Sequence, residues 1–126
     1  MRKRKCIIID DEEHYRESLK EFLSRDCEIV TFKHPDEFAE AVSSPEDLIG
    51  VYLVVLDYKF DTFDAYDKDI VTYIRDDLSY KRNLVLWSLQ DRFSQEFIEP
   101  IDAVLPKRLM TLPEIEKCIE EQKKSS

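Results

Sequence analysis

Short apolar runs without polar alternation recur along the chain, and they predict buried strands. They cover residues 6–9, 51–56 and 84–87, are rich in Val, Ile and Leu, and end at a polar residue. Such runs are typical of parallel strands that have helices over both faces of the sheet. Two weaker runs, at residues 28–32 and 102–105, complete a predicted five-stranded sheet.

The segments between these runs have helical spacing. The predicted helices are marked by Tyr15, Leu19, Phe22 and Leu23; by Phe38 and Val42 after Pro35; by Ile70, Val71, Ile74 and Leu78; by Phe93 and Phe97; and by Ile115, Cys118 and Ile119. The last helix has a capping box of Thr111 and Glu114, with Pro113 in its first turn. Five alternations of strand and helix predict an open, doubly wound α/β sheet, and we expect residues 1–126 to form a single domain.

Glycine is almost absent, and this excludes several ways of binding phosphate. The 126 residues include one glycine, Gly50. The dinucleotide fingerprint, the P-loop and the G-x-S-x-G elbow each need several glycines, so none of them is present. Any phosphate chemistry must therefore use side chains in place of a glycine-rich backbone cradle.

Charge and cysteine content restrict the partners and the compartment. Acidic residues outnumber basic ones 28 to 19, and the net charge of −9 opposes binding to nucleic acid or anionic membranes. No apolar run is long enough to cross a bilayer. Cys6, Cys27 and Cys118 lack C-x-x-C spacing, so we interpret them as buried free thiols in a reducing compartment, and we predict a cytoplasmic protein.

Polar residues follow the predicted strands at the edge where open α/β sheets bind ligands. They are Asp10, Asp11 and Glu12 after the first strand, Asp57 after the third, Ser88 after the fourth and Lys107 after the fifth. Clustered carboxylates repel one another unless a cation neutralises them, and Mg²⁺ is the hard divalent ion that suits oxygen ligands. A carboxylate beside a metal and a lysine can accept a phosphoryl group, so the pattern predicts phosphoryl transfer to an aspartate.

At these residues the sequence resembles the receiver domains of two-component response regulators. The matching segments are Ile7-Ile8-Ile9-Asp10-Asp11-Glu12, Leu53-Val54-Val55-Leu56-Asp57, Leu84-Val85-Leu86-Trp87-Ser88 and Leu105-Pro106-Lys107, in the family's order. The resemblance implies a flavodoxin-like (βα)5 fold with strand order 2-1-3-4-5. It also implies signalling through protein contacts and no enzymatic turnover of a substrate.

The resemblance assigns a role to each site residue. Asp57 would be the phospho-acceptor, Lys107 would pair with the phosphoryl group, and Ser88 would hydrogen-bond it. Asp57, Asp11, Asp10 (mainly through water) and the backbone carbonyl of Lys59 would hold Mg²⁺. The phosphoryl donor would be a phosphohistidine on a sensor histidine kinase or a histidine phosphotransfer protein.

The output implied by the family is a change in the face formed by the fourth helix, the fifth strand and the fifth helix. That face would bind a downstream protein target, and the domain itself would not bind nucleic acid or membrane. Three departures mark an atypical member: Val104 replaces a usual aromatic residue, Leu89 replaces a small residue after the hydroxyl, and the acidic loop 58–69 has an unusual sequence.

Two alternatives remain open from the sequence. The first is a degenerate receiver that acts as an interaction module without phosphorylation, which Val104, Leu89 and the loop favour. The second is a phosphohydrolase of the haloacid dehalogenase type, although Lys59 occupies the position where such enzymes carry a second aspartate. Trp87, on a buried strand, is interpreted as core filling.

Overall fold

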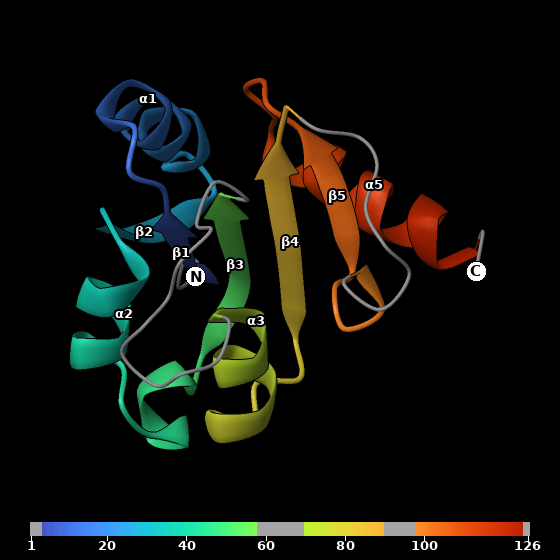
Figure 1. Cartoon of the computed structure of the whole chain (residues 1–126). Helices are drawn as coiled ribbons and strands as arrows, with labels where there is room; N and C mark the ends of the chain where they lie inside the picture. Colours follow the sequence, from blue (N-terminus) through green and yellow to red (C-terminus); the bar gives the residue numbers. More distant parts are fainter. Residues whose placement is uncertain (1–3, 58–69, 90–97, 125–126) are drawn as a thin grey trace.

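The computed structural model describes residues 4–57, 70–89 and 98–124, and its centre is a five-stranded parallel sheet (Figure 1). The strand order is β2-β1-β3-β4-β5. The strands are β1 (Arg4–Ile9), β2 (Cys27–Phe32), β3 (Val51–Asp57), β4 (Asn83–Ser88) and β5 (Ala103–Pro106). The predicted parallel sheet and its order 2-1-3-4-5 are therefore confirmed.

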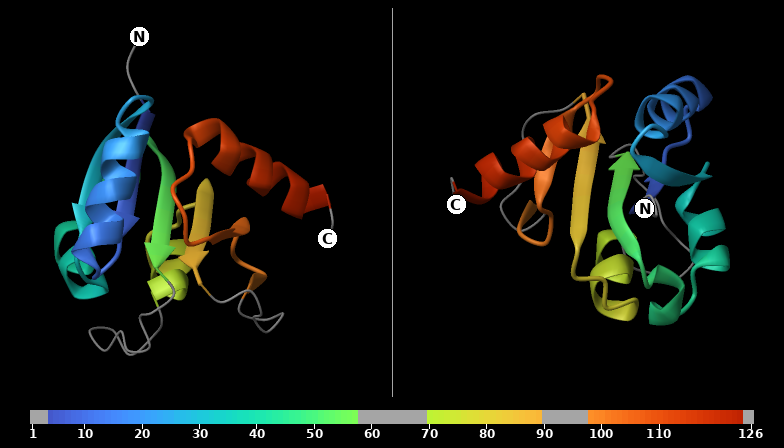
Figure 2. Two further views of the ribbon diagram at one scale, coloured as in Figure 1. Left: turned by 90° about the horizontal axis from the view of Figure 1, so that it is seen from above. Right: turned by 180° about the vertical axis from the view of Figure 1, so that it is seen from behind.

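Helices cover both faces of this sheet. The described helical segments are α1 (Glu13–Leu23), α2 (Pro35–Ala41), the 3-10 turn η1 (Pro45–Leu48), α3 (Ile70–Thr72) with the π-helical turn η2 (Tyr73–Asp77), and α5 (Leu112–Lys124). Figure 2 shows α1 and α5 on one face, and α2 and α3 on the other. The predicted helix around Phe93 and Phe97 falls on residues 90–97, outside the described residues.

The central strands are buried on both faces, which explains their continuous apolar sequence. On β3, Leu53 and Val55 pack in the cluster that includes α1 and α5, whereas Val54 and Leu56 pack in the cluster that includes α2 and α3. Each of the four side chains is at most 2% exposed. Because successive residues of a strand face opposite sides, burial on both sides removes the polar alternation.

The third helix differs from the regular helix that its spacing predicts. In the described part of the chain, the α-helical residues Ile70–Thr72 lead into η2, where the amide of Leu78 donates to the carbonyl of Tyr73, five residues earlier. Arg75 lies in this turn and donates to the carbonyls of Pro100, Tyr80 and Arg82. Arg75 in the π-turn thus connects the segment before β5 with the loop before β4.

The fifth strand begins one residue later than predicted because Asp102 has another role. Its carboxylate accepts the amide of Leu84 at 2.8 Å and pairs with Arg75 at 2.9 Å. After β5, the predicted capping box is confirmed: the amide of Thr111 donates to Glu114, and the amide of Glu114 donates back to the Thr111 hydroxyl. The bond from the Thr111 backbone holds the pKa of Glu114 below its usual value.

None of the helices in the described ranges is both long enough and apolar enough to cross a membrane.

Candidate functional site

The strand ends bring the predicted site residues together at one edge of the sheet. Asp57 is in register with Trp87 on β4, and Ile9 is in register with Leu56 on β3. Asp10, one residue beyond Ile9, is therefore level with Asp57. Lys107 follows the end of β5 and reaches toward both aspartates.

A single lysine lies between two buried carboxylates. The Lys107 Nζ atom is 2.6 Å from Asp10 Oδ2 and 2.9 Å from Asp57 Oδ1. The exposed fractions of the three side chains are 3%, 0% and 2% in the same order, so water screens these charges poorly. The predicted convergence of Asp10, Asp57 and Lys107 is thus present in the structure.

Asp10 is held by the start of α1. Its Oδ1 atom accepts the amide of Glu12 at 2.8 Å, and its backbone carbonyl accepts a bond from the Arg16 guanidinium at 2.9 Å. Arg16 is only 5% exposed, and it is not among the site residues predicted from the sequence. The signal was available, because Arg16 precedes Leu19 by three residues and so lies on the buried stripe of the helix.

The acidic cluster has donors that suit a hard divalent cation. One carboxylate oxygen from each of Asp10, Asp11 and Asp57 can be chosen so that all three lie within 4.8 Å of one another, with Asp11 exposed and the other two buried. Lys107 contacts two of these three carboxylates, and a divalent cation such as Mg²⁺ would supply further positive charge to the cluster. A donor set made of carboxylate oxygens fits this ion. Lys59, the fourth predicted ligand, lies outside the described residues.

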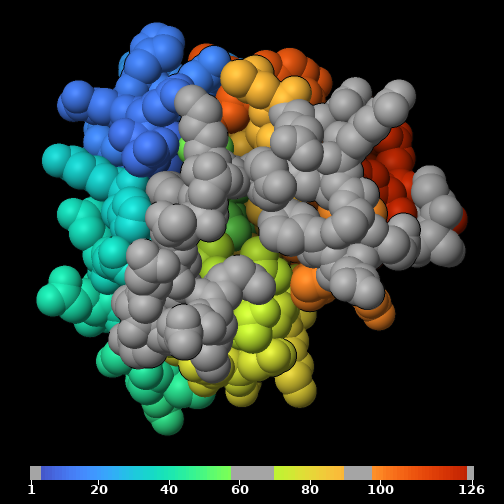
Figure 3. Space-filling model, in the orientation of Figure 1, coloured from blue at the N-terminus to red at the C-terminus, as the bar shows by residue number. Residues whose placement is uncertain are grey.

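Two aromatic rings also lie next to the lysine. The Lys107 Nζ atom is 4.8 Å from the ring centre of Tyr15 on α1 and 4.7 Å from that of Trp87 on β4. The space-filling view shows α1 close to the end of β4 on this side of the molecule (Figure 3). Trp87 is buried as predicted, but its contact with the lysine goes beyond core filling.

The predicted hydroxyl, Ser88, and the two atypical positions, Leu89 and Val104, lie on or directly after strands β4 and β5. Ser88 ends β4 and is 7% exposed, so it stands at the correct strand end. Leu89, which follows it, is 74% exposed and therefore does not pack into the core. Val104 lies on β5, where its backbone amide and carbonyl both bond the side-chain amide of Gln122 on α5, each at 2.9 Å.

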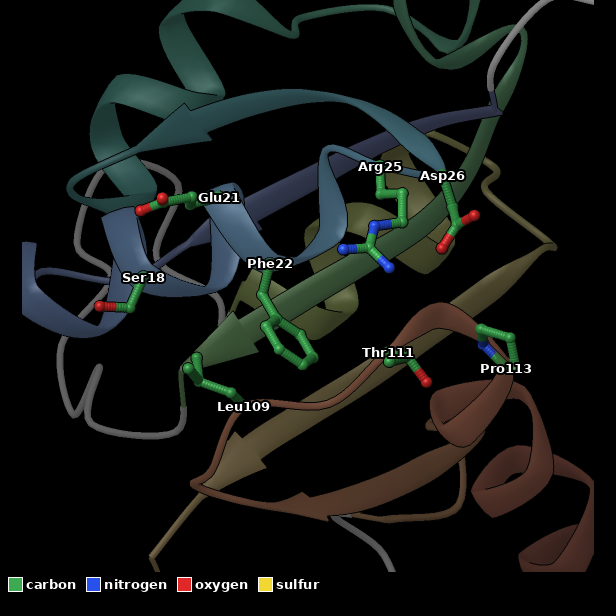
Figure 4. Close-up of a pocket in the computed structure, with 8 residues that line it drawn as sticks. All are labelled: Ser18, Glu21, Phe22, Arg25, Asp26, Leu109, Thr111 and Pro113. Atoms are coloured by element: carbon green, nitrogen blue, oxygen red, sulfur yellow. The ribbon is translucent and has the colours of Figure 1, made fainter.

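A groove of about 510 Å³ lies between α1 and the segment that follows Lys107. It is lined by Ser18, Glu21, Phe22, Arg25, Asp26, Leu109, Thr111 and Pro113 (Figure 4). Phe22 and Leu109 are large apolar side chains that are 42% and 41% exposed, and charged side chains of both signs surround them. The groove thus has a surface of mixed apolar and charged side chains. Its lining residues follow the acidic pair Asp10 and Asp11, and Lys107, in the sequence.

Comparisons with known proteins bear on the fold. No family model matches the sequence, and none of the curated proteins matches it significantly. Among solved structures, a response regulator receiver domain from Clostridium thermocellum is 19% identical, with a TM-score of 0.70 over 96% of each chain. The receiver domain of the histidine kinase CKI1 from Arabidopsis thaliana, solved as a mutant, is 16% identical, with a TM-score of 0.74 over 98% of this chain and 91% of that one.

A third similar structure was solved with ligands. The response regulator TrrA from Thermotoga maritima, in complex with Mg²⁺-BeF, is 20% identical, with a TM-score of 0.64 over 96% of this chain and 97% of that one. At such identities the likeness establishes the fold alone. This chain has the fold of response regulator receiver domains, as the resemblance of its motifs predicted.

Proposed function

We propose that this protein is a phospho-accepting receiver in two-component signalling, with Asp57 as the acceptor. The observation that carries the proposal is the buried Lys107 ammonium between Asp10 and Asp57, at the carboxyl edge of a receiver-type sheet. The donor is a phosphohistidine on a sensor histidine kinase or histidine phosphotransfer protein. Such partners present their phosphohistidine in the cytoplasm, where we expect this protein to act.

The chemistry is a displacement at phosphorus. A carboxylate oxygen of Asp57 attacks the phosphorus atom while the bond from phosphorus to the imidazole nitrogen breaks, and that nitrogen keeps the electron pair. The Lys107 ammonium faces the negative charge of the transferred oxygens. Ser88 donates a hydrogen bond to the phosphoryl group. Asp10, Asp11, Asp57 and the Lys59 carbonyl would hold Mg²⁺, which would supply further charge neutralisation.

The output surface that we propose is the face of the fourth helix, β5 and α5, of which the fourth helix lies outside the described residues. Val104 on β5 is bonded through its backbone to Gln122 on α5, and Lys123 pairs with Asp102 at 3.4 Å. With valine in place of an aromatic switch residue, a change at Lys107 reaches α5 through movement of the backbone. This surface binds the downstream protein target.

Phosphorylation by a small donor tests the proposal. Incubation with Mg²⁺ and acetyl phosphate should add one phosphoryl group by intact-mass spectrometry, and Asp57→Asn should abolish it. Asp36→Asn, which changes an exposed aspartate on α2, is the matched control and should be phosphorylated like the wild type. Lack of any modification in the wild type, with unchanged amide signals in beryllium fluoride, would refute the acceptor role.

The two alternatives give different results in the same experiments. A degenerate receiver, which the valine at position 104 favours, would remain unmodified under every condition. A phosphohydrolase would turn over a generic phosphomonoester in an Asp57-dependent way, whereas we propose that this protein carries out no such turnover.

A further inference from the structure

We propose that Tyr15 and Trp87 form a two-ring clamp that positions the Lys107 ammonium group for phosphoryl transfer. The inference rests on the proposed role of Asp57 as acceptor. Among the described residues, four groups contact the ammonium: the carboxylates of Asp10 and Asp57, and the rings of Tyr15 and Trp87. Both ring centres lie within 5 Å of Nζ, well inside the range of about 6 Å for cation–π attraction.

The rings are themselves held in place. Their planes meet at 85° with centres 5.6 Å apart, which is the edge-to-face arrangement that aromatic pairs favour. Trp87 is 1% exposed, and its indole Nε1–H donates to the backbone carbonyl of Arg108 at 3.1 Å. A rigid pair of rings therefore faces a side chain that would otherwise be flexible.

Trp87 makes two contacts with the segment that carries the lysine, one to a side chain and one to the backbone. Its ring faces the Lys107 ammonium, and its N–H group binds the carbonyl of the next residue, Arg108. The position of the ammonium and the path of the backbone after β5 are thus both set by one indole. Few side chains could make both contacts, because indole combines a large π face with a fixed N–H donor.

The clamp has a function that the carboxylates cannot supply. During transfer, Asp57 changes from a carboxylate to an acyl phosphate, so its contact with Lys107 must change. The rings are uncharged and take no part in the reaction, so they hold the ammonium in place while its acidic partner is modified. A cation already in position lowers the barrier because little reorganisation is needed as negative charge moves onto the transferred oxygens.

The first test needs no activity. A ring current shifts nearby protons upfield, so the Lys107 Hε signals of the resting protein should lie upfield of ordinary lysine values in NMR spectra. Trp87→Leu and Tyr15→Leu should each move them back downfield, whereas Tyr15→Phe, which keeps the ring, should leave them in place. Ordinary Hε shifts in the wild type would overturn the clamp.

The second test is the rate of phosphorylation by acetyl phosphate in the presence of Mg²⁺. Tyr15→Leu and Trp87→Leu should each be roughly threefold to thirtyfold slower than the wild type, and Tyr15→Phe should restore the wild-type rate. Phe38→Leu, a buried aromatic change on the opposite face of the sheet, is the control for general loosening of the core and should not slow the reaction.

The outcomes separate the clamp from the proposed function. Wild-type rates in folded Tyr15→Leu and Trp87→Leu would overturn the clamp and leave the acceptor role intact. An equal loss in Phe38→Leu would overturn it too, because the effect would then follow stability alone. If the wild type is not phosphorylated, the acceptor role fails, and the Lys107 signals alone decide whether the rings hold the cation. If Trp87→Leu does not fold, Tyr15→Leu on the half-buried Tyr15 carries the test.

Discussion

The two ends of the sheet combine the same kinds of side chain in opposite surroundings. At the carboxyl edge, Lys107 meets two aspartates and the faces of two aromatic rings. At the amino edge, the guanidinium of Arg4 pairs with Glu116 of α5 at 2.9 Å and lies 4.2 Å from the ring centre of Tyr52. Arg82 approaches the same ring at 5.2 Å.

Burial separates these two arrangements. The Lys107 side chain is 3% exposed, whereas those of Arg4 and Glu116 are 52% and 38% exposed. In water, screening and side-chain entropy leave an ion pair with little net effect on stability. In the interior, each charge depends on its partners, because an unpaired charge there is very costly. The ion pair at the amino edge therefore contributes little to the packing of α5 on the sheet. At the carboxyl edge, the buried charges depend on one another, so a bound ligand can change their interactions.

Removal of one cation from each end should give the largest contrast. Lys107→Met removes the cation that contacts both buried carboxylates, Asp10 and Asp57, and we expect the free energy of unfolding to fall by about 3–5 kcal/mol. Arg4→Met should cause a much smaller loss. Urea denaturation without divalent ions measures both. Mg²⁺ should restore part of the stability of Lys107→Met and none of the loss in Arg4→Met.

A double variant checks that the loss arises from the buried carboxylates. Asp10→Asn combined with Lys107→Met removes one negative charge together with the cation, so it should be more stable than Lys107→Met alone. Equal losses in Lys107→Met and Arg4→Met would show that burial does not distinguish the two ends.

Local patterns predicted those parts of the fold that they encode directly. The strands β1, β3 and β4 were predicted because residues buried on both faces leave continuous apolar runs. The capping box at Thr111 was predicted because its two partners lie three residues apart in sequence. The predictions for the edge strands were less accurate. The first predicted residue of β5, Asp102, lies before the strand, where its carboxylate pairs with Arg75 and accepts the amide of Leu84.

The site was predicted as a set of residues, whereas its internal contacts were not. Asp10, Asp57 and Lys107 could be placed together because parallel strands end at the same edge. Trp87 was interpreted as core filling and Tyr15 as part of the apolar stripe of a helix, because hydrophobic spacing shows which face a side chain lies on and not what it touches. Their contact with Lys107 joins residues of α1, β4 and the segment after β5, which no local period relates.

Alkaline pH should destabilise the fold through the tyrosines near the amino edge of the sheet. Burial raises the pKa of Tyr80, which is 4% exposed, while the nearby Arg82 and Arg75 act in the opposite direction and Cys6 and Asp102 add to the increase. Because the pKa of Tyr80 is raised in the folded state, its contribution to the free energy of unfolding is fully present below the ordinary tyrosine pKa near 10. That contribution is lost as the pH rises above this value. We expect a loss of about 1.4 kcal/mol for each pH unit above that value.

Substitution of the phenol should remove this part of the pH dependence. Urea midpoints at about pH 9 and about pH 11 should differ less in Tyr80→Phe than in the wild type. The pKa of Tyr52 is raised by burial and by its hydrogen bond to Glu116, but the side chain is only half-buried, so Tyr52→Phe should flatten the profile less. An identical pH profile in Tyr80→Phe and the wild type would contradict the role of burial.

The smallest expected effect is that of salt on the exposed pair at the amino edge. Glu116→Gln removes the charge that faces Arg4 but keeps an oxygen that can accept the Tyr52 hydroxyl. The variant should lose a little stability at low ionic strength and nothing at 1 M NaCl, because the screening length falls to about 3 Å. The loss in Lys107→Met should persist in the same salt, because ions cannot enter between its buried partners. If salt erased both losses equally, the lysine would be in contact with solvent, and the two ends of the sheet would differ only in which residues they carry.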